Sequence, residues 1–207
     1  VEKKMNDLWQ KSILELSKFL NADPEGMVFV TNATMGVNTI LRSLKLSPGD
    51  EIIVPDHAYQ ACRNAIDFVT ERSGARTVIV PVPFRVDDES EIIDPILSAV
   101  SDRTVLAMID TVSSPTGIRM PFEILVLELQ NKGVDVLVDA AHGPGLVPLD
   151  IRKLNPAYIT GNCHKWLCTP KGSAFLHIRE DKREEVNPLN IGHGYSSDLP
   201  PAEKFRF

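Results

Sequence analysis

The sequence predicts an α/β protein of three layers, α/β/α, in which a mostly parallel sheet lies between two layers of helices. Short apolar runs with strand character alternate along the 207 residues with longer stretches of helical periodicity. Strands that alternate with helices at this spacing build βαβ units, which form parallel sheets covered on both faces. The chain is 43% hydrophobic and 24% charged, which is ordinary for a globular protein with a substantial core.

The N-terminal half supplies the first four predicted strands. A helix over 3–20 is predicted because apolar residues recur there near helical spacing, and the turn-forming run 21–26 ends it. The strands that follow are 27–30, 51–55, 76–82 and 104–110. Helices are predicted between these strands: one over 37–44, one that reaches about Ser73 and one over 92–100.

The C-terminal half continues the alternation. A hydroxyl-rich turn, 111–117, leads to a helix over 122–132, for which Gly133 is the expected C-cap. Strands follow at 134–138, 157–160 and 173–178. Polar or small residues follow five of the strands, near Thr31, Asp56, Thr111, Asp139 and Gly161. We expect them to face one pocket, because ligands of open α/β sheets bind at the carboxyl edge of the strands.

Composition excludes several classes of function. The formal net charge of −6 argues against broad nucleic-acid binding, which uses a basic face. The sequence shows neither a membrane-spanning apolar run nor a signal-peptide core. Cys62, Cys163 and Cys168 lack paired-ligand spacing, which predicts reduced thiols in a cytoplasmic protein. The five histidines show no metal-ligand spacing either, so we predict no metal site.

The candidate chemistry lies at two strand ends. Asp139 ends the apolar run 134–138, and Lys165 lies in a turn-like run after the strand that ends at Thr160. An amine and a carboxylate at neighbouring strand ends suit pyridoxal 5'-phosphate (PLP), which needs a lysine for a Schiff base and an acid to keep its ring nitrogen protonated. The structural alternatives are a strand-end aspartate that caps the next turn and an ordinary surface lysine.

A third segment, 31–36, joins a strand to a helix. The first N–H groups of a helix have no internal partners and the helix dipole favours an anion there, so this turn is a candidate phosphate site. The alternative is that Thr31 or Asn32 merely caps the helix.

Three segments, in this order, resemble the class V aminotransferase group of fold-type-I PLP enzymes: Thr31-Asn32-Ala33-Thr34, Asp139-Ala140-Ala141-His142-Gly143 and Gly161-Asn162-Cys163-His164-Lys165-Trp166. Within that group, Asn-Ala-Thr-x-Gly-Val-Asn and His-Lys-Trp-Leu followed by Pro-Lys-Gly are most similar to the isopenicillin N epimerase-like branch. The resemblance implies the large domain of fold type I. It divides the chain into an N-terminal helix, 1–20, a PLP-binding large domain, 21–185, and the start of a connection, 186–207, to a C-terminal small domain that the chain does not contain.

The resemblance also implies a role for each site residue. Lys165 would form the Schiff base, Asp139 would pair with the pyridine nitrogen and His142 would lie by the phenolic oxygen. The phosphate would be held by the backbone N–H groups of Ala33 and Thr34 together with Asn162 and His164. His57 is the preferred ring-stacking residue, Tyr59 is its alternative, and Ser114 would contact the ring or the substrate.

The implied activity is chemistry at the α-carbon of a small amino acid or derivative, as an epimerase or aminotransferase, in a homodimer with active sites near the subunit interface. Two alternatives stay open: a PLP-dependent C–S lyase or cysteine desulfurase-like enzyme, and a non-catalytic binding protein or inactive fragment that keeps the large-domain fold. The fate of the carbanion formed at the α-carbon decides between epimerase, transaminase and lyase, and the residues do not fix it.

Overall fold

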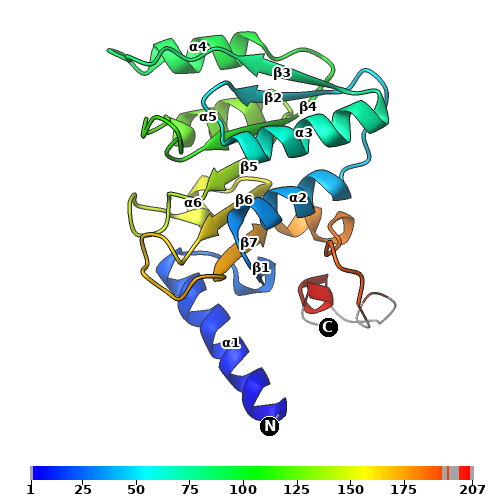
Figure 1. The fold of residues 1–207 in the computed structure, drawn as a ribbon, viewed down its shortest axis with the longest axis vertical. Coiled ribbons are helices and arrows are strands. Elements are labelled where there is room, and N and C mark those ends of the chain that lie inside the picture. Colours follow the sequence, from blue (N-terminus) through cyan, green and yellow to red (C-terminus); the bar gives the residue numbers. More distant parts are fainter. Residues whose placement is uncertain (1, 193–194, 196–200, 206–207) are drawn as a thin grey trace.

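A computed structural model describes residues 2–192, 195 and 201–205 (Figure 1). The α-helices are α1 (Glu2–Phe19), α2 (Ala33–Ser43), α3 (Gln60–Ser73), α4 (Ser90–Ser98), α5 (Phe122–Asn131) and α6 (Ile151–Leu154). The strands are β1 (Met27–Val30), β2 (Glu51–Pro55), β3 (Arg76–Val80), β4 (Thr104–Asp110), β5 (Asp135–Ala140), β6 (Tyr158–Asn162) and β7 (Ala174–Ile178). Short 3-10 helices are η1 (Pro24–Gly26), η2 (Glu180–Glu185) and η4 (Pro201–Phe205).

The seven strands form one sheet in the order β1-β7-β6-β5-β4-β2-β3. Strand β7 is antiparallel to both of its neighbours, β1 and β6. The remaining strand pairs are parallel. The predicted α/β class with a mostly parallel sheet is therefore confirmed.

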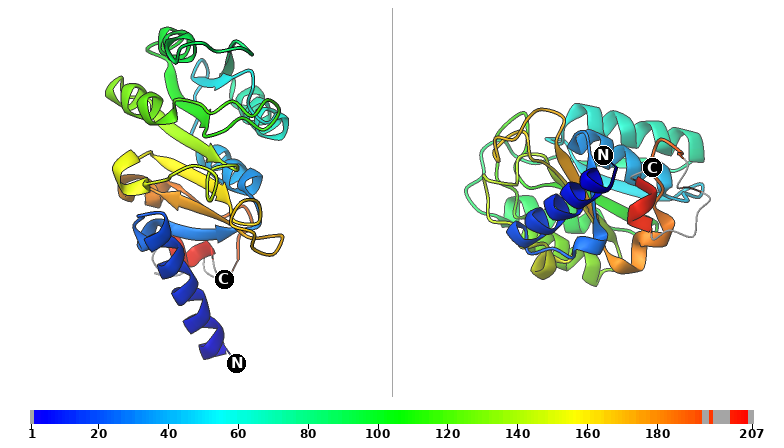
Figure 2. Two further views of the ribbon diagram at one scale, coloured as in Figure 1. Left: turned by 90° about the vertical axis from the view of Figure 1, so that its left-hand side faces the viewer. Right: turned by 90° about the horizontal axis from the view of Figure 1, so that it is seen from below.

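The sheet separates two hydrophobic cores. Successive side chains of a strand point to opposite faces, so Val138 packs with apolar residues of α1, α4, α5 and α6, whereas its neighbour Leu137 packs with those of α2 and α3. Figure 2 shows the corresponding layers, with α2 and α3 on one face of the sheet and α5 and α6 on the other. The same alternation places Asp139 on the α2–α3 side.

The predicted strands and helices are all found among the described residues, with small differences at their ends. Strand β5 continues through Asp139 to Ala140 instead of ending before the aspartate, because Ala140 still pairs with Gly161 of β6. Strand β3 ends at Val80, and the one-turn helix α6 was not predicted. The predicted connection 186–207 falls partly on residues 193–194, 196–200 and 206–207, which lie outside the described residues. No helix in the described part of the chain has the length and apolar character that crossing a bilayer requires.

Candidate active site

A cavity of about 470 Å³ lies at the carboxyl edge of the sheet, on the side covered by α2 and α3. The start of α2 and the segments that follow β2, β4, β5 and β6 all contribute to it. It brings together eight of the ten residues that the resemblance assigned: Thr34, Tyr59, Ser114, Asp139, His142, Asn162, His164 and Lys165.

Asp139 is the buried carboxylate of this cavity, with 2% of its surface exposed. One oxygen, Oδ1, accepts the backbone N–H of Ala141 at 2.9 Å, and Oδ2 accepts the thiol of Cys62, with 3.4 Å between the heavy atoms. Burial raises the pKa of Asp139, and the Ala141 N–H, the Cys62 thiol and the Lys165 amine oppose that rise. A cation beside the carboxylate would therefore be strongly favoured.

Asp110 is a second buried carboxyl group in the same cavity, which the sequence reasoning did not select. It ends β4, is paired in register with Asp139, and is 4% exposed. Its carboxyl group makes no hydrogen bond to any residue that the structure describes. Burial and the neighbouring Asp139 raise its pKa well above the ordinary range. Its signal in the sequence was the same as that of Asp139, an aspartate ending an apolar strand at this edge.

Lys165, His142 and Trp166 form a short chain of polar contacts at the cavity. The Lys165 Nζ lies 3.0 Å from His142 Nε2. The indole N–H of Trp166 donates to His142 Nδ1, with 3.2 Å between the nitrogens. Burial lowers the pKa of Lys165, although Asp139 and Cys62 oppose that shift. Burial, and then the charge of Lys165, lower the pKa of His142.

The first turn of α2 holds the candidate phosphate site. Asn32 caps the helix, because its Oδ1 accepts the N–H of Met35 at 2.8 Å. The predicted phosphate donor Ala33 gives its N–H to Asn162 Oδ1 at 2.9 Å and does not line the cavity. Thr34 lines the cavity, and its N–H has no partner among the described residues. Capping and anion binding are therefore compatible at this turn, because different N–H groups serve them.

The stacking and substrate positions divide between two loops. Tyr59 lines the cavity, but the preferred candidate His57 does not. The His57 ring is held instead by the turn after β4, because its Nδ1 lies 3.1 Å from Thr116 Oγ1. Ser114 of that same turn does reach the cavity.

The ring of His164 is fixed by Ser173, with Nδ1 2.8 Å from the Ser173 carbonyl oxygen and 3.2 Å from the Ser173 nitrogen.

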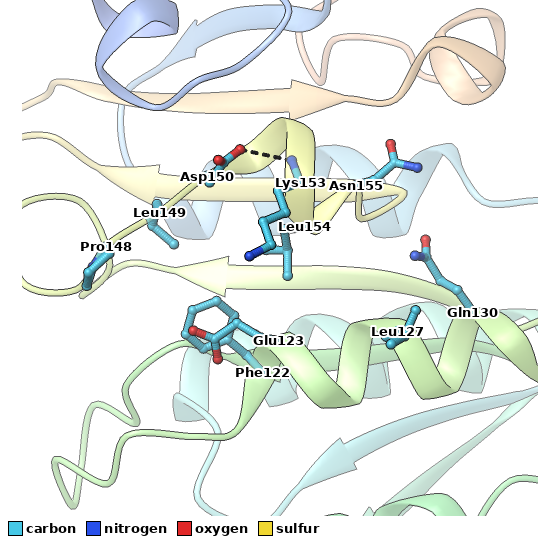
Figure 3. A pocket seen from close by; sticks show the side chains of 10 residues that line it. All are labelled: Phe122, Glu123, Leu127, Gln130, Pro148, Leu149, Asp150, Lys153, Leu154 and Asn155. Atoms are coloured by element: carbon cyan, nitrogen blue, oxygen red, sulfur yellow. Dashed lines mark hydrogen bonds between the residues drawn. The ribbon is translucent and has the colours of Figure 1, made fainter.

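A second, larger cavity of about 610 Å³ lies on the other face of the sheet, between α5 and the segment 148–155 (Figure 3). Helix α5 lines it with the apolar Phe122 and Leu127 and with the polar Glu123 and Gln130. Asp150 there accepts the backbone N–H of Lys153, which is a helix cap. We place the active site in the smaller cavity because an amine, two carboxyl groups and two imidazoles converge there.

The fold is that of fold-type-I PLP-dependent proteins, and the carboxyl edge of its mostly parallel sheet presents a lysine amine and a buried aspartate to one cavity. The chain belongs to the Aminotransferase class-V family, which it matches over residues 2–204. The family and the fold predicted from the sequence are thereby confirmed.

Three of the curated relatives are named as enzymes of two kinds. The chain is 32% identical to isopenicillin N epimerase of Streptomyces clavuligerus, over 97% of this chain and 51% of the relative. It is 34% identical to the isopenicillin N epimerase of Amycolatopsis lactamdurans, over 93% and 50%. It is 31% identical to putative L-cysteine desulfhydrase 1 of Oryza sativa subsp. japonica, over 92% and 43%. The chain thus spans about half the length of the curated relatives it matches.

Solved structures share the fold. The complex between the cystine C–S lyase C-DES and its reaction product cysteine persulfide superposes with a TM-score of 0.90 at 23% identity, over 99% of this chain and 57% of that one. A variant of C-DES with glycine covalently linked to its PLP cofactor gives 0.86 at 22% identity, over 99% and 56%.

Proposed function

We propose that this chain is the cofactor-binding part of a PLP-dependent enzyme that acts at the α-carbon of a small amino acid or derivative. One observation carries the proposal: the Lys165 amine and the Asp139 carboxyl group line one cavity and interact electrostatically across it. The family match and the cofactor of the C-DES variant support PLP as the ligand.

The residues present fit this cofactor. Asp139 is buried beside another carboxyl group, an arrangement that is costly without a cation, and a protonated pyridine nitrogen would supply that cation. The unpaired Thr34 N–H at the N-terminus of α2, with Asn162 and His164 beside it, would hold the phosphate. Tyr59 would contact the ring face, and His142 would lie by the phenolic oxygen.

The chemistry of the site then follows from its own groups. When bound, PLP supplies the electron sink that makes the α-carbon of an amino acid acidic. Lys165 Nζ would receive and return the α-proton, because burial lowers its pKa toward the range of a usable base. Asp139 would keep the ring nitrogen protonated, held between the Ala141 N–H and the Cys62 thiol.

The reaction branch is a second proposal. We favour epimerase- or aminotransferase-like chemistry, because the isopenicillin N epimerases match almost the whole chain. The alternative, a C–S lyase, is supported by the cysteine desulfhydrase relatives. Cys163 next to the site does not favour a desulfurase, because it is 3% exposed and burial raises the pKa of its thiol. We further propose a homodimer.

Absorbance on addition of PLP tests the cofactor proposal. The purified protein should develop a band at the edge of the visible range, and Lys165→Ala should abolish it. Lys171→Ala, which removes an exposed lysine from the same loop, should leave the band intact. A wild-type protein without a band, or a Lys165→Ala protein that keeps the wild-type band, would contradict the proposal and favour a non-catalytic binding protein.

A panel of L- and D-amino acids and sulfur-containing derivatives then separates the reaction branches. The panel should be followed for α-proton exchange and for release of pyruvate, ammonia and sulfide. Exchange without elimination is the expected result; elimination with sulfide release would assign the lyase alternative instead.

A further inference from the structure

Trp166 and His142 together specify where a proton lies. The indole N–H of Trp166 is a donor only, so His142 Nδ1 must accept it. A neutral imidazole that accepts at Nδ1 carries its hydrogen on Nε2. The rings are tilted by 56° with their centroids 6.3 Å apart, so the contact is a hydrogen bond at the ring edge and not a stacked pair.

The consequence reaches Lys165. Its Nζ lies 3.0 Å from His142 Nε2, and an N–H at that position can donate only to an amine that keeps its lone pair. An ammonium group would instead set a donor against a donor. The other titratable side chains that line the same cavity are Tyr59, Asp110, Asp139 and His164. Burial lowers the pKa of both His142 and Lys165, which shifts each group toward its neutral form.

We propose that Trp166 is a positioning residue: it fixes His142 as the Nε2–H tautomer, and through that hydrogen it keeps the Lys165 amine unprotonated and able to attack the cofactor aldehyde. The part concerning the aldehyde rests on the proposed function, whereas the tautomer itself does not. Trp166 is 49% exposed and acts through His142, which lines the cavity. With half of its surface exposed, Trp166 does not serve mainly to fill the hydrophobic core.

The first test is nitrogen-15 NMR of the His142 ring in the full chain without PLP. The wild-type protein should show the Nε2–H form. Trp166→Phe keeps an aromatic ring but removes the donor, so the Nδ1–H form should appear and the pKa of His142 should rise by about half a unit to one unit. Trp9→Phe is the matched control, because Trp9 packs edge-on against Phe29 with ring centroids 5.0 Å apart and does not line the cavity.

The second test is the rate at which the absorbance band forms when PLP is added at pH 7.5. Trp166→Phe should slow it about three- to tenfold, and the loss should disappear at higher pH, where the amine is unprotonated in any case. In a His142→Gln variant, the glutamine side chain has an N–H donor whether or not Trp166 is present. Adding Trp166→Phe to that variant should therefore change the rate of band formation by less than about twofold.

The outcomes separate the two proposals. An unchanged His142 tautomer and pKa in Trp166→Phe, or a wild-type protein in the Nδ1–H form, would overturn the positioning role. So would an equal slowing by Trp166→Phe with and without His142. The proposed function is contradicted by a different result, a Lys165→Ala protein that still forms the absorbance band. That result would not affect the conclusion from NMR about the His142 tautomer.

Discussion

Asp110 and Asp139 occupy equivalent positions at the ends of β4 and β5, but only Asp139 has hydrogen-bond partners among the described residues. Two carboxyl groups this close cannot both ionise easily in a buried site, so they titrate as a pair. The Ala141 N–H and the Cys62 thiol stabilise the charge on Asp139. We therefore assign the first ionisation to Asp139 and the retained proton to Asp110, which leaves the charge where a pyridine nitrogen would need it.

Replacing Asp110 with Asn tests this assignment in the PLP-free protein. A carboxyl group whose folded pKa is raised contributes stability that is complete below its unfolded pKa of about 4 and is lost as the pH rises through the folded pKa. Asp110→Asn removes that loss, so the variant should be more stable than wild type by about 1–2 kcal/mol at pH 7.5, with the difference shrinking toward pH 4. Urea unfolding at several pH values measures it.

The exposed Asp102, which lies just before β4, provides the control. Asp102→Asn should shift the unfolding midpoint little at any pH. A variant Asp110→Asn that is less stable than wild type at pH 7.5 would mean that the carboxylate form of Asp110 is the favoured one.

At the residue level, the sequence predicted some of the groups at strand ends but missed Asp110 at the end of β4, and it missed Cys62, which reaches the site from α3. Asp139 and Lys165 were found because an apolar strand precedes each. Cys62 was missed because its contact with Asp139 joins the buried side of α3 to a strand 77 positions later. The sequence favoured His57 over Tyr59 as the stacking residue, but the His57 ring is held by Thr116 and does not line the cavity, whereas Tyr59 does.

At the level of elements, α2 lies unusually close to β6. A Cβ built on Gly36 would lie 2.1 Å from Thr160 Oγ1 and 2.7 Å from Thr160 Cβ, so only glycine allows this approach. Thr160 cannot rotate freely, because its hydroxyl donates to the Phe175 carbonyl oxygen at 2.7 Å. The close packing sets the first turn of α2, and with it the Thr34 N–H, against the strand end that carries Asn162.

Gly36→Ala should therefore destabilise the protein. Alanine gains about 1 kcal/mol in helix propensity, but overpacking against a held side chain costs about 1–3 kcal/mol and displaces α2. The net free energy of unfolding should fall by up to about 2 kcal/mol, and PLP should bind more weakly because the Thr34 N–H moves. Chemical unfolding and PLP titration measure the two effects.

Thr160→Ala in the same chain removes the contact with Oγ1 but leaves the Cβ at 2.7 Å, so it should restore only part of the loss in PLP affinity. If Gly36→Ala binds PLP as tightly as wild type, the position of α2 does not control the phosphate site.

Element boundaries were predictable to within a few residues, whereas the arrangement of the elements was only partly so. Apolar period and turn residues located every strand, including β1 and β7. They did not reveal that β7 runs antiparallel between β1 and β6, because strand direction depends on pairing partners and not on local pattern. The one-turn helix α6 has too few residues to show a helical period.

At the scale of the whole molecule, the site exists only when distant parts of the chain are folded together. The cavity draws on residues from Asn32 to Lys165, contributed by the start of α2 and by the loops after β2, β4, β5 and β6. A ligand that contacts all of these segments binds the folded chain and not the unfolded one. Its binding free energy must therefore appear as stability of the entire sheet.

PLP at about 100 times its dissociation constant should stabilise the fold by about 2.7 kcal/mol, which for a chain of this size raises the melting temperature by roughly 5–10 °C. Lys165→Ala should keep part of the rise, since Asp139 and the start of α2 remain, while Lys171→Ala should show all of it. Pyridoxal lacks the phosphate, so the Thr34 N–H has no anion to bind. It should therefore raise the melting temperature less than PLP does, in the wild-type protein and in each variant. Calorimetry measures each of these shifts. Equal rises with pyridoxal and PLP would remove α2 from the binding site, and no rise with PLP would mean that the lysine and the aspartate do not hold a common ligand.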